Sequence, residues 1–447
     1  MNTPIYDFVR SYAESDISRL HMPGHKGVPF LGCEPLDITE IAGADELFSA
    51  DGIILESEKN AASLFGTAHS FYSTEGSTLA IKAMLALVSA SARAEGKRPR
   101  VLAARNAHKA FIYACALLDL DAEWLYGSGA EHLCACRISA EEVETALRVT
   151  DSLPSAVYLT SPDYLGNIAD IEGIAKVCHA YGVPLLVDNA HGAYLKFLSP
   201  SRHPIDLGAD LCCDSAHKTL PCLTGGAYLH ISKNADSEYL ASARDLMALF
   251  ATTSPSYLIL QSLDLCNRYI AEDYPAQLRE SADKLSSLRT RLADMGFSIA
   301  QTEPLKLVIC AAESGYCGSD LAEILRENMV EAEFVDRDYI VLMATPQTHD
   351  SDLERIAVAL SRISPKEPIQ RENLLPCIAE TSPLSIREAV LAPSELVSVE
   401  SAEGRICGAP TVSCPPAIPI VVSGERISKS AVDLFVRYGI KKIKVVR

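Results

Sequence analysis

The sequence predicts an α/β fold with a mostly parallel central sheet and helices on both of its faces. A smaller α+β domain and a C-terminal module are expected to follow. Short, continuously apolar runs alternate with amphipathic runs between about residues 60 and 235, which is typical of buried parallel strands joined by helices. The pattern changes near residue 270, and prolines cluster from about residue 367 onward. A chain of 447 residues suits two or three domains, which we expect at residues 1–270, 271–366 and 367–447.

Continuous apolar runs in the first region indicate strands that are buried on both faces. They lie at residues 100–104, 156–160, 184–188 and 210–213. Between the second and the third, residues 171–181 place their apolar side chains on one helical face. Strand, helix and strand in this order form one βαβ unit, and several in succession make a mostly parallel sheet.

The region beyond residue 270 has a different pattern. A long amphipathic stretch at residues 276–295 precedes strand-like runs at 305–311 and 339–344 and a further helix, which indicates an α+β domain. The proline-rich tail ends in strand-like runs at residues 418–424 and 440–446, so we expect a compact C-terminal module.

Composition and charge exclude several classes of protein. The apolar fraction of 48% and the charged fraction of 22% are those of an ordinary globular protein, and no uninterrupted apolar run is long enough to span a membrane. The balance of 40 basic against 58 acidic residues, a formal charge of -18, disfavours nucleic acid and anionic membranes as partners. The N-terminus lacks the pattern of a signal peptide. Because the 14 cysteines lie scattered through apolar, strand-like runs, we expect reduced thiols and a cytoplasmic location.

Polar residues that follow the predicted strands identify a candidate site, because ligands of an open parallel sheet bind beyond the carboxyl ends of its strands. The residues that follow the four strands are Asn106, His108 and Lys109; Ser161, Asp163 and Tyr164; Asn189, Ala190 and His191 after the strand-ending Asp188; and Asp214, Ser215, His217 and Lys218. An acid, histidines and a lysine are therefore expected at one edge of the sheet.

A further segment, with Gly76, Ser77 and Thr78, precedes a helical run at residues 79–88. Free N–H groups and hydroxyls at a helix N-terminus suit a phosphate. Each of these signals alone is more often structural, as an N-cap or as a hydrogen-bonded histidine. Together they provide what pyridoxal phosphate requires, namely a phosphate site, an acid for the ring nitrogen and a lysine for covalent attachment.

The sequence resembles the ornithine/lysine/arginine decarboxylase family of fold-type-I pyridoxal-phosphate enzymes, in a short form without an N-terminal receiver-like domain. The resembling segments are RLHMPGHKG (19–27), GADELFSADGII (43–54), RNAHKAF (105–111), SPDYLGN (161–167), VPLLVDNAHGAY (183–194), GADLCCDSAHKTLPCLTGGAYLH (208–230), TTSPSY (252–257), PLSIREAV (383–390) and CPPAIPIVVSGERIS (414–428). They cover nearly the whole chain, and the PGHKG and SAHKTLP elements are specific to this family.

The resemblance implies roles for individual residues. Lys218 would bind the cofactor covalently, Asp188 would pair with the pyridine nitrogen, His108 would stack on the ring, Gly76, Ser77, Thr78, Ser215 and His217 would hold the phosphate, and Ala190 and His191 would lie close to the ring. Catalysis would involve Lys218 with His108 and His217. The family implies a homodimer with a shared active site, or a higher oligomer, with residues 252–257 at the interface.

The implied reaction is the decarboxylation of a basic amino acid (lysine, arginine or ornithine) to its amine. One alternative is transamination or elimination on the same fold; an aminotransferase would use an arginine for the substrate carboxylate, for which Arg371, Arg387, Arg405 and Arg426 are available. The other is a non-catalytic cofactor-binding relic. The carboxylates considered for the distal cation of the substrate are Asp45, Glu46 and Glu425. We expect no metal, because the His132, Cys134 and Cys136 cluster has no second pair at zinc spacing.

Some positions depart from the family pattern. Glu75 and Leu79 stand where the family commonly has Asn and a hydroxyl residue, Asn189 and Tyr194 replace an acid and a histidine, and Gly225 and Gly226 replace bulkier residues. An acid beside a phosphate is unfavourable unless it points away or is paired. The two glycines would widen the site. These departures bear on the substrate and not on the cofactor.

Overall fold

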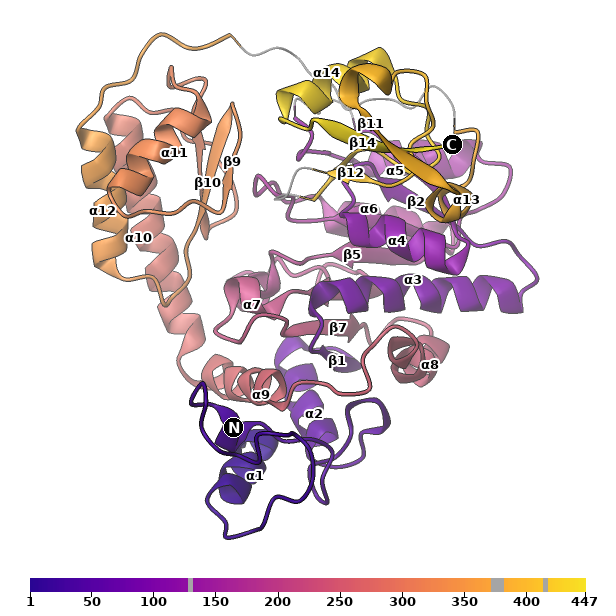
Figure 1. The fold of residues 1–447 in the computed structure, drawn as a ribbon, viewed down its shortest axis with the longest axis vertical. Coiled ribbons are helices and arrows are strands. Elements are labelled where there is room, and N and C mark those ends of the chain that lie inside the picture. The colour runs from indigo at the N-terminus through magenta and orange to yellow at the C-terminus, as the bar shows by residue number, and fades with distance from the viewer. Residues whose placement is uncertain (128–131, 371–381, 413–416) are drawn as a thin grey trace. The chain divides into compact units, whose positions relative to one another are not determined.

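The computed structural model describes residues 1–127, 132–370, 382–412 and 417–447 (Figure 1). The chain divides into two compact units. The first unit consists of Met1–Pro99, Thr150–Leu159 and Ile171–Pro275, and the second unit consists of Arg100–Val149, Thr160–Asp170 and Ala276–Arg447. The predicted division into three domains stays a prediction.

The first unit contains a sheet with helices around it. Its strands are β1 (His69–Ser73), β4 (Ala156–Thr160), β5 (Leu185–Asp188), β6 (Leu211–Asp214) and β7 (Ala227–Ile231). Its helices are α1 (Pro4–Ala13), α2 (Ile53–Phe65), α3 (Gly76–Ala94), α6 (Ile171–Ala180), α7 (Ala216–Thr219), α8 (Ser237–Ala248) and α9 (Tyr257–Glu272), with short 3-10 helices at Glu34–Leu36, Leu47–Ser49 and Ala193–Phe197.

The order of these strands, β1-β7-β6-β5-β4, brings distant segments to one edge. Strands β5 and β6 are parallel, whereas β7 is antiparallel to both β6 and β1. Strand β1 therefore runs in the same direction as β5 and β6. The carboxyl ends of β1, β5 and β6 and the start of β7 consequently lie at the same edge of the sheet.

Burial shows that the strands of this sheet are covered on both faces. Every residue of β5, β6 and β7 is buried, although successive side chains point to opposite faces. Helix α3 contacts β5, β6 and β7, and α8 packs against α3 (Figure 1). Among the described residues, no helix is both long and apolar enough to cross a membrane.

The predicted strands agree closely with those observed. Residues 156–160 are β4 and residues 100–104 are β2 of the second unit, as predicted. Strand β5 begins at Leu185, one residue later than predicted, since Pro184 has no N–H to donate to a ladder. Strand β6 is shifted by one residue to Leu211–Asp214. Strands β1 and β7 were not predicted.

The second unit begins with another βαβ segment. Strands β2 (Arg100–Ala104) and β3 (Asp121–Leu125) pair in parallel, and helix α4 (Lys109–Leu118) connects them. Helix α5 (Ala140–Val149) lies further along the chain.

The second unit also contains a three-stranded antiparallel sheet of order β8-β10-β9, made of Lys306–Cys310, Tyr339–Met343 and Phe334–Val335. Its helices are α10 (Tyr274–Asp294), α11 (Gly318–Glu327) and α12 (Asp350–Ser361). Alternation along β8 separates two cores, because Leu307 and Ile309 pack with residues of these helices whereas Val308 packs with residues of the C-terminal elements.

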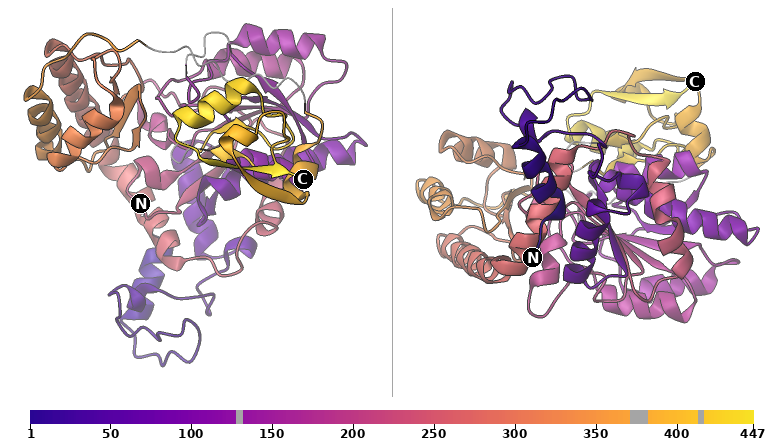
Figure 2. Two further views of the ribbon diagram at one scale, coloured as in Figure 1. Left: turned by 45° about the horizontal axis from the view of Figure 1, so that its top comes forward. Right: turned by 90° about the horizontal axis from the view of Figure 1, so that it is seen from below.

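The C-terminal elements are α13 (Ile386–Leu391), β11 (Ser394–Ser398), a 3-10 helix at Val399–Ser401, β12 (Thr411–Val412), β13 (Pro419–Val421), α14 (Lys429–Arg437) and β14 (Lys442–Val446). Strand β11 pairs with β14 and β12 with β13, both antiparallel. Coloured orange to yellow, these elements gather into one group in both views of Figure 2. The strand-like tail runs predicted from the sequence correspond to β13 and β14.

Candidate active site

The predicted site residues of the first unit gather at the edge of the sheet where β1, β5 and β6 end. Asp188 is the last residue of β5. Ser215 directly follows β6 and precedes the short helix α7, which carries Lys218. Gly76 begins helix α3, three residues after the end of β1. The prediction that these segments meet at one edge is confirmed for this unit.

The side chains of Lys218 and His191 contact each other directly. Lys218 Nζ lies 3.0 Å from His191 Nε2, and His191 is almost completely buried. The turn that carries His191 leaves β5 immediately after Asp188 and is closed by a hydrogen bond from the N–H of Gly192 to the carbonyl of Asn189. The lysine amine and the imidazole can therefore share a proton at this edge.

Two serine hydroxyls meet at the N-terminus of α3. Ser215 Oγ donates to Ser77 Oγ over 2.8 Å, while Thr78 beside them is exposed. Gly76 has a left-handed φ of 68°, which glycine adopts without steric cost. Its N–H donates to the carbonyl of Gly225 over 2.7 Å. This arrangement of hydroxyls and a helix N-terminus is of the kind that binds phosphate.

Gly225 permits the close approach of two backbone segments. It has a φ of 100°, and a Cβ placed on it would lie 2.8 Å from the carbonyl oxygen of Thr74. The lack of a side chain at Gly225 thus allows the loop before α3 to pack against it. The expectation that the glycines widen the site is incomplete, because a side chain at Gly225 would clash with this loop.

Asp188 is buried and receives three hydrogen bonds. Its Oδ2 accepts from the hydroxyl of Tyr158 over 3.2 Å, and its Oδ1 accepts from the N–H of Ala190 over 3.2 Å. The thiol of Cys213 also donates to Oδ1, over 3.5 Å. Donors to a carboxylate favour its ionised form.

His217 is neutral, with its proton on Nδ1. Its Nδ1 lies 3.0 Å from the carbonyl oxygen of Gly226, which can only accept, so the ring nitrogen must donate. Burial lowers the pKa of His217, and the charge of neighbouring Lys218 lowers it further. Nε2 is therefore the acceptor atom of this side chain at neutral pH.

The two residues near α3 that depart from the family pattern, Glu75 and Leu79, occupy positions compatible with a phosphate site. The side chain of Glu75 is exposed, and its Oε1 accepts the N–H of Thr252 over 2.7 Å, so the acid is paired with the 252–257 segment. Leu79 is buried within α3 as a core residue. Neither observation supports the relic hypothesis, which depended on these two positions.

A buried polar network lies directly behind the site and was not predicted. Asn189 Nδ2 donates to Asp214 Oδ1 over 2.7 Å, and the Nε2 atoms of His203 and His230 lie 3.0 and 3.1 Å from Asp214 Oδ2. Asp214 and both histidines have no exposed surface. Burial alone would raise the pKa of Asp214, but His203 and His230 outweigh it and hold this pKa well below its usual value.

The same network contains the residue types of a metal site. The ligand atoms of His203, Asp214 and His230 lie within 4.8 Å of one another. The prediction of no metal rested on the His132 cluster and overlooked these residues. Since Asp214 already accepts from both imidazoles and from Asn189, we interpret the group as a hydrogen-bond network that ties the end of β5 to the end of β6.

His108 belongs to the second unit, where it caps helix α4. It is half-buried, and its Nδ1 accepts the N–H of Ala110 over 3.1 Å. The sequence places it directly after β2, as predicted. Its proposed stacking on the cofactor stays a prediction.

The carboxylates considered for the substrate's distal cation have local partners. Asp45 accepts several backbone N–H groups, including those of Gly52 and Ile54 at 2.9 Å, and so caps helix α2. Glu425 is buried, and its Oε2 pairs with Arg105 at 3.2 Å. Glu46 is exposed and accepts from Ser49.

The arginines considered for an aminotransferase also have local partners. Arg387 donates to the carbonyl of Leu117, Arg405 pairs with Glu395, and Arg426 donates to the carbonyl of Gly404. Arg371 lies outside the described residues.

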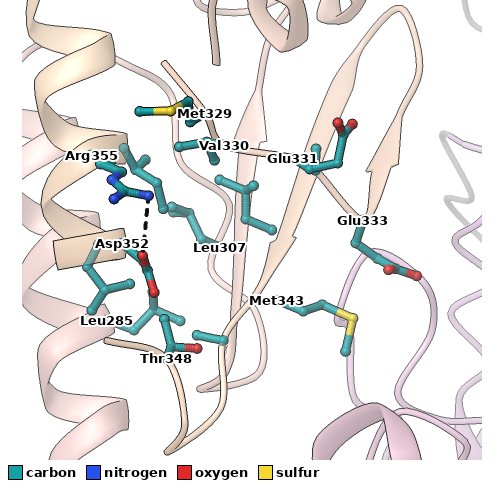
Figure 3. A pocket seen from close by; sticks show the side chains of 15 residues that line it. Leu285, Leu307, Met329, Val330, Glu331, Glu333, Met343, Thr348, Asp352 and Arg355 are labelled. Atoms are coloured by element: carbon teal, nitrogen blue, oxygen red, sulfur yellow. Dashed lines mark ion pairs between the residues drawn. The ribbon is translucent and has the colours of Figure 1, made fainter. Parts of the chain in front are cut away.

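A pocket of about 410 Å³ lies in the second unit, between the β8-β10-β9 sheet and helix α12 (Figure 3). Its lining is largely apolar, with Asp352 and Arg355 paired over 3.8 Å at one side. None of the predicted site residues is among those described as lining it. Every cysteine in the described ranges is a free thiol, as expected.

The chain is similar to known proteins over nearly its whole length. Residues 3–296 match the family model described as Orn/Lys/Arg decarboxylase, major domain, and residues 372–439 match the C-terminal domain of the same family. An uncharacterised protein of Bacillus subtilis, YaaO, is 30% identical over 97% of this chain and 93% of its own length. An arginine decarboxylase of the same bacterium is 29% identical over 96% of this chain and 92% of its own length.

The crystal structure of a lysine decarboxylase from Francisella novicida is similar in fold. Its TM-score is 0.81 at 16% identity, and the match covers 100% of this chain and 81% of that protein. The fold-type-I prediction is thereby confirmed, as is the prediction of pyridoxal phosphate as cofactor. The chain belongs to the Orn/Lys/Arg decarboxylase family and is a pyridoxal-phosphate-dependent decarboxylase.

Proposed function

We propose that this enzyme decarboxylates a basic amino acid (lysine, arginine or ornithine) to the corresponding amine, and that Lys218 binds its cofactor. The observation that carries the proposal is the grouping of Lys218 with His191, Ser215 with Ser77, and the buried Asp188 at one edge of a sheet. The relatives named as arginine decarboxylases support the substrate class.

The residues at this edge fit pyridoxal phosphate. The hydroxyls of Ser77 and Ser215 and the N-terminus of α3 offer donors to the phosphate. Lys218 lies on α7, three residues after Ser215. The carboxylate of Asp188, oriented by its hydrogen bonds from Tyr158, Ala190 and Cys213, would accept a hydrogen bond from a protonated ring nitrogen. When bound, the cofactor supplies an electron sink for the electrons that remain at the α-carbon after carbon dioxide leaves.

Proton transfer is the task that we assign to Lys218 and His191. The amine Nζ and the imidazole Nε2 are 3.0 Å apart, so a proton can pass between them without movement of either backbone. We propose that Lys218 delivers this proton to the α-carbon of the substrate and that His191 restores it. His217 would help to hold the phosphate once the negative charge of the phosphate has placed a second proton on Nε2, since Nδ1 already donates to Gly226.

The remaining roles follow from the resemblance. Thr78 would add a hydroxyl to the phosphate site, Ala190 would lie against the ring, and His108 would stack on it. Asp45 and Glu425 already serve helix α2 and Arg105, so we propose neither as the partner of the substrate's distal cation. Glu46 stays the candidate for that contact.

We further propose a homodimer in the cytoplasm. Large apolar side chains near the N-terminus are strongly exposed, at 93% for Leu20, 92% for Phe30 and 86% for Leu31. Exposed apolar patches of this kind mark interaction sites, and a second copy of the chain is the partner that the family implies. Free thiols support a reducing compartment.

The proposal is tested by incubating the cofactor-loaded protein with each of the twenty amino acids and ornithine, and measuring carbon dioxide and amines by mass spectrometry. We expect cadaverine, agmatine or putrescine. A keto acid without carbon dioxide would show transamination instead, and no product from any amino acid would contradict the proposal.

A lysine variant tests the site assignment. Lys218→Ala should lose the visible absorption band of lysine-bound cofactor and its trapping by borohydride, whereas the control Lys233→Ala, at an exposed position, should keep both. Retention of borohydride-trapped cofactor in Lys218→Ala would show that another lysine holds it.

A further inference from the structure

We propose that Tyr158 is a positioning residue for the reaction, which fixes the carboxylate of Asp188 toward the ring nitrogen of the cofactor. The inference rests on the proposed role of Asp188. It adds a residue from the preceding strand, β4, that the strand-end pattern of the sequence did not single out.

The geometry places the tyrosine hydroxyl on one particular oxygen. Tyr158 lies in the middle of β4, next to β5 in the sheet, and is completely buried. Its hydroxyl donates to Asp188 Oδ2 over 3.2 Å. A hydroxyl on a rigid ring in a central strand cannot follow the carboxylate if the latter rotates, so the bond holds the carboxylate in one orientation.

Among the described contacts of Asp188, Oδ2 is the oxygen with room for a further donor. Oδ1 already accepts the N–H of Ala190 and the thiol of Cys213. A carboxylate oxygen accepts about two hydrogen bonds, so Oδ1 is saturated by the protein. Oδ2 has one acceptor direction occupied by Tyr158, and its second remains for the ring N–H.

Protonation of the ring nitrogen depends on the same bond. A carboxylate that points at the ring N–H favours the protonated nitrogen. Without the hydroxyl of Tyr158 the carboxylate could turn away, and the ring nitrogen would then lose its proton more readily. The ring would then accept electrons less well, because its capacity as an electron sink depends on the protonated nitrogen.

A tyrosine that only fills the core would behave differently, and Tyr158→Phe separates the two roles. This change keeps the ring and its packing and removes only the oxygen. Tyr228→Phe is the matched control, since Tyr228 is equally buried in β7 and, within the described part of the chain, its hydroxyl makes one long contact, 3.5 Å to Asn267. The thermal midpoint of each holoenzyme reports any loss of folding.

We expect Tyr158→Phe to lower kcat and the affinity for pyridoxal phosphate by about tenfold to a hundredfold, the range for a hydrogen bond to a charged group. KM should change little. The nitrogen NMR signal of cofactor labelled with ¹⁵N in its ring should move toward the deprotonated position, and Tyr228→Phe should leave this signal unchanged. Cys213→Ala, which removes the weaker donor, should move it less.

A double-mutant cycle with Asp188→Asn, read out as cofactor affinity, tests whether Tyr158 acts through Asp188. The effect of Tyr158→Phe should disappear in the Asp188→Asn background. An effect of equal size in both backgrounds, or a wild-type nitrogen signal in Tyr158→Phe, would overturn the inference. Because affinity and the nitrogen signal need no turnover, they test Tyr158 even if no amino acid is decarboxylated.

Discussion

Replacing Asn189 by Asp should destabilise the protein in a way that depends steeply on pH. The change turns the donor that lies 2.7 Å from Asp214 Oδ1 into a second carboxylate. Both side chains are completely buried, and two carboxylates at this distance cannot both be ionised. The folded variant must therefore take up one proton, which the pair shares.

The cost of that proton sets the magnitude. An ordinary Asp has a pKa of about 3.9, and each pKa unit is worth about 1.4 kcal/mol, so protonation at pH 7 costs about 4 kcal/mol. The new O–H donor replaces the lost N–H donor and offsets little of this cost. At pH 5 the same proton costs only about 1.5 kcal/mol. Since the folded variant binds a proton that its unfolded chain lacks, its stability must fall as the pH rises.

Urea unfolding of wild type and Asn189→Asp at fixed protein and cofactor concentrations measures the difference. The gap in unfolding free energy should widen by about 2.7 kcal/mol between pH 5 and pH 7. Asn234→Asp, the same change at an exposed position, should stay within about 0.5 kcal/mol of wild type at both values. A gap for Asn189→Asp that does not change with pH would refute the proton-sharing argument.

Other perturbations test different parts of the first unit. Gly225→Ala should lower the free energy of unfolding in urea by about 1–3 kcal/mol more than Gly76→Ala does. Both glycines have a positive φ, but of the two only Gly225 would bring the new Cβ against a backbone oxygen. Equal losses in the two variants would contradict this account. Asp264, which accepts the N–H groups of Ile5 and Tyr6, has its pKa raised to about 6 by burial. As its folded pKa exceeds the unfolded value, the folded state gains stability from the protonated form at low pH. That advantage should fall by about 2 kcal/mol between pH 4 and pH 6. Asp264→Asn should lack this decline, and parallel curves of thermal midpoint against pH for the two proteins would exclude it.

Much of the fold could be predicted because its central strands are continuous apolar runs. Strands β2 and β4 have the predicted bounds, and β5 and β6 differ by one residue. Strand β1 was missed since its sequence, HSFYS, is largely polar. Those polar groups are satisfied only in the folded sheet, where Ser70 Oγ lies 2.8 Å from His230 Nδ1. No local pattern indicates such a partner 160 residues away.

For the site, the rule that ligands bind beyond the carboxyl ends of the strands identified the residues at one edge of the sheet. It did not identify the residues that hydrogen-bond to them. Asp188, Ser215 and Lys218 follow strands directly, so their gathering could be anticipated from the order of elements. The contact of Asp214 with His230 depends on β7 lying beside β6, which periodicity does not reveal. Tyr158 in an apolar strand looks like any core tyrosine, and only its 3.2 Å contact distinguishes it.

The position of β7 between β1 and β6 has a consequence for the order of folding. Residue His69 of β1 is paired with Ile231 of β7, so this ladder cannot form until the whole segment between these two residues, which includes parts of both units, has closed into a loop. Contacts of such large sequence separation form slowly. The β5-β6 pair, in which Leu186 faces Leu211, closes a far shorter loop. We therefore expect the amide protons of β5 and β6 to gain protection in pulsed hydrogen exchange before those of β1. The loop that leads from β1 into α3 would then form last. Earlier protection of β1 would contradict this order.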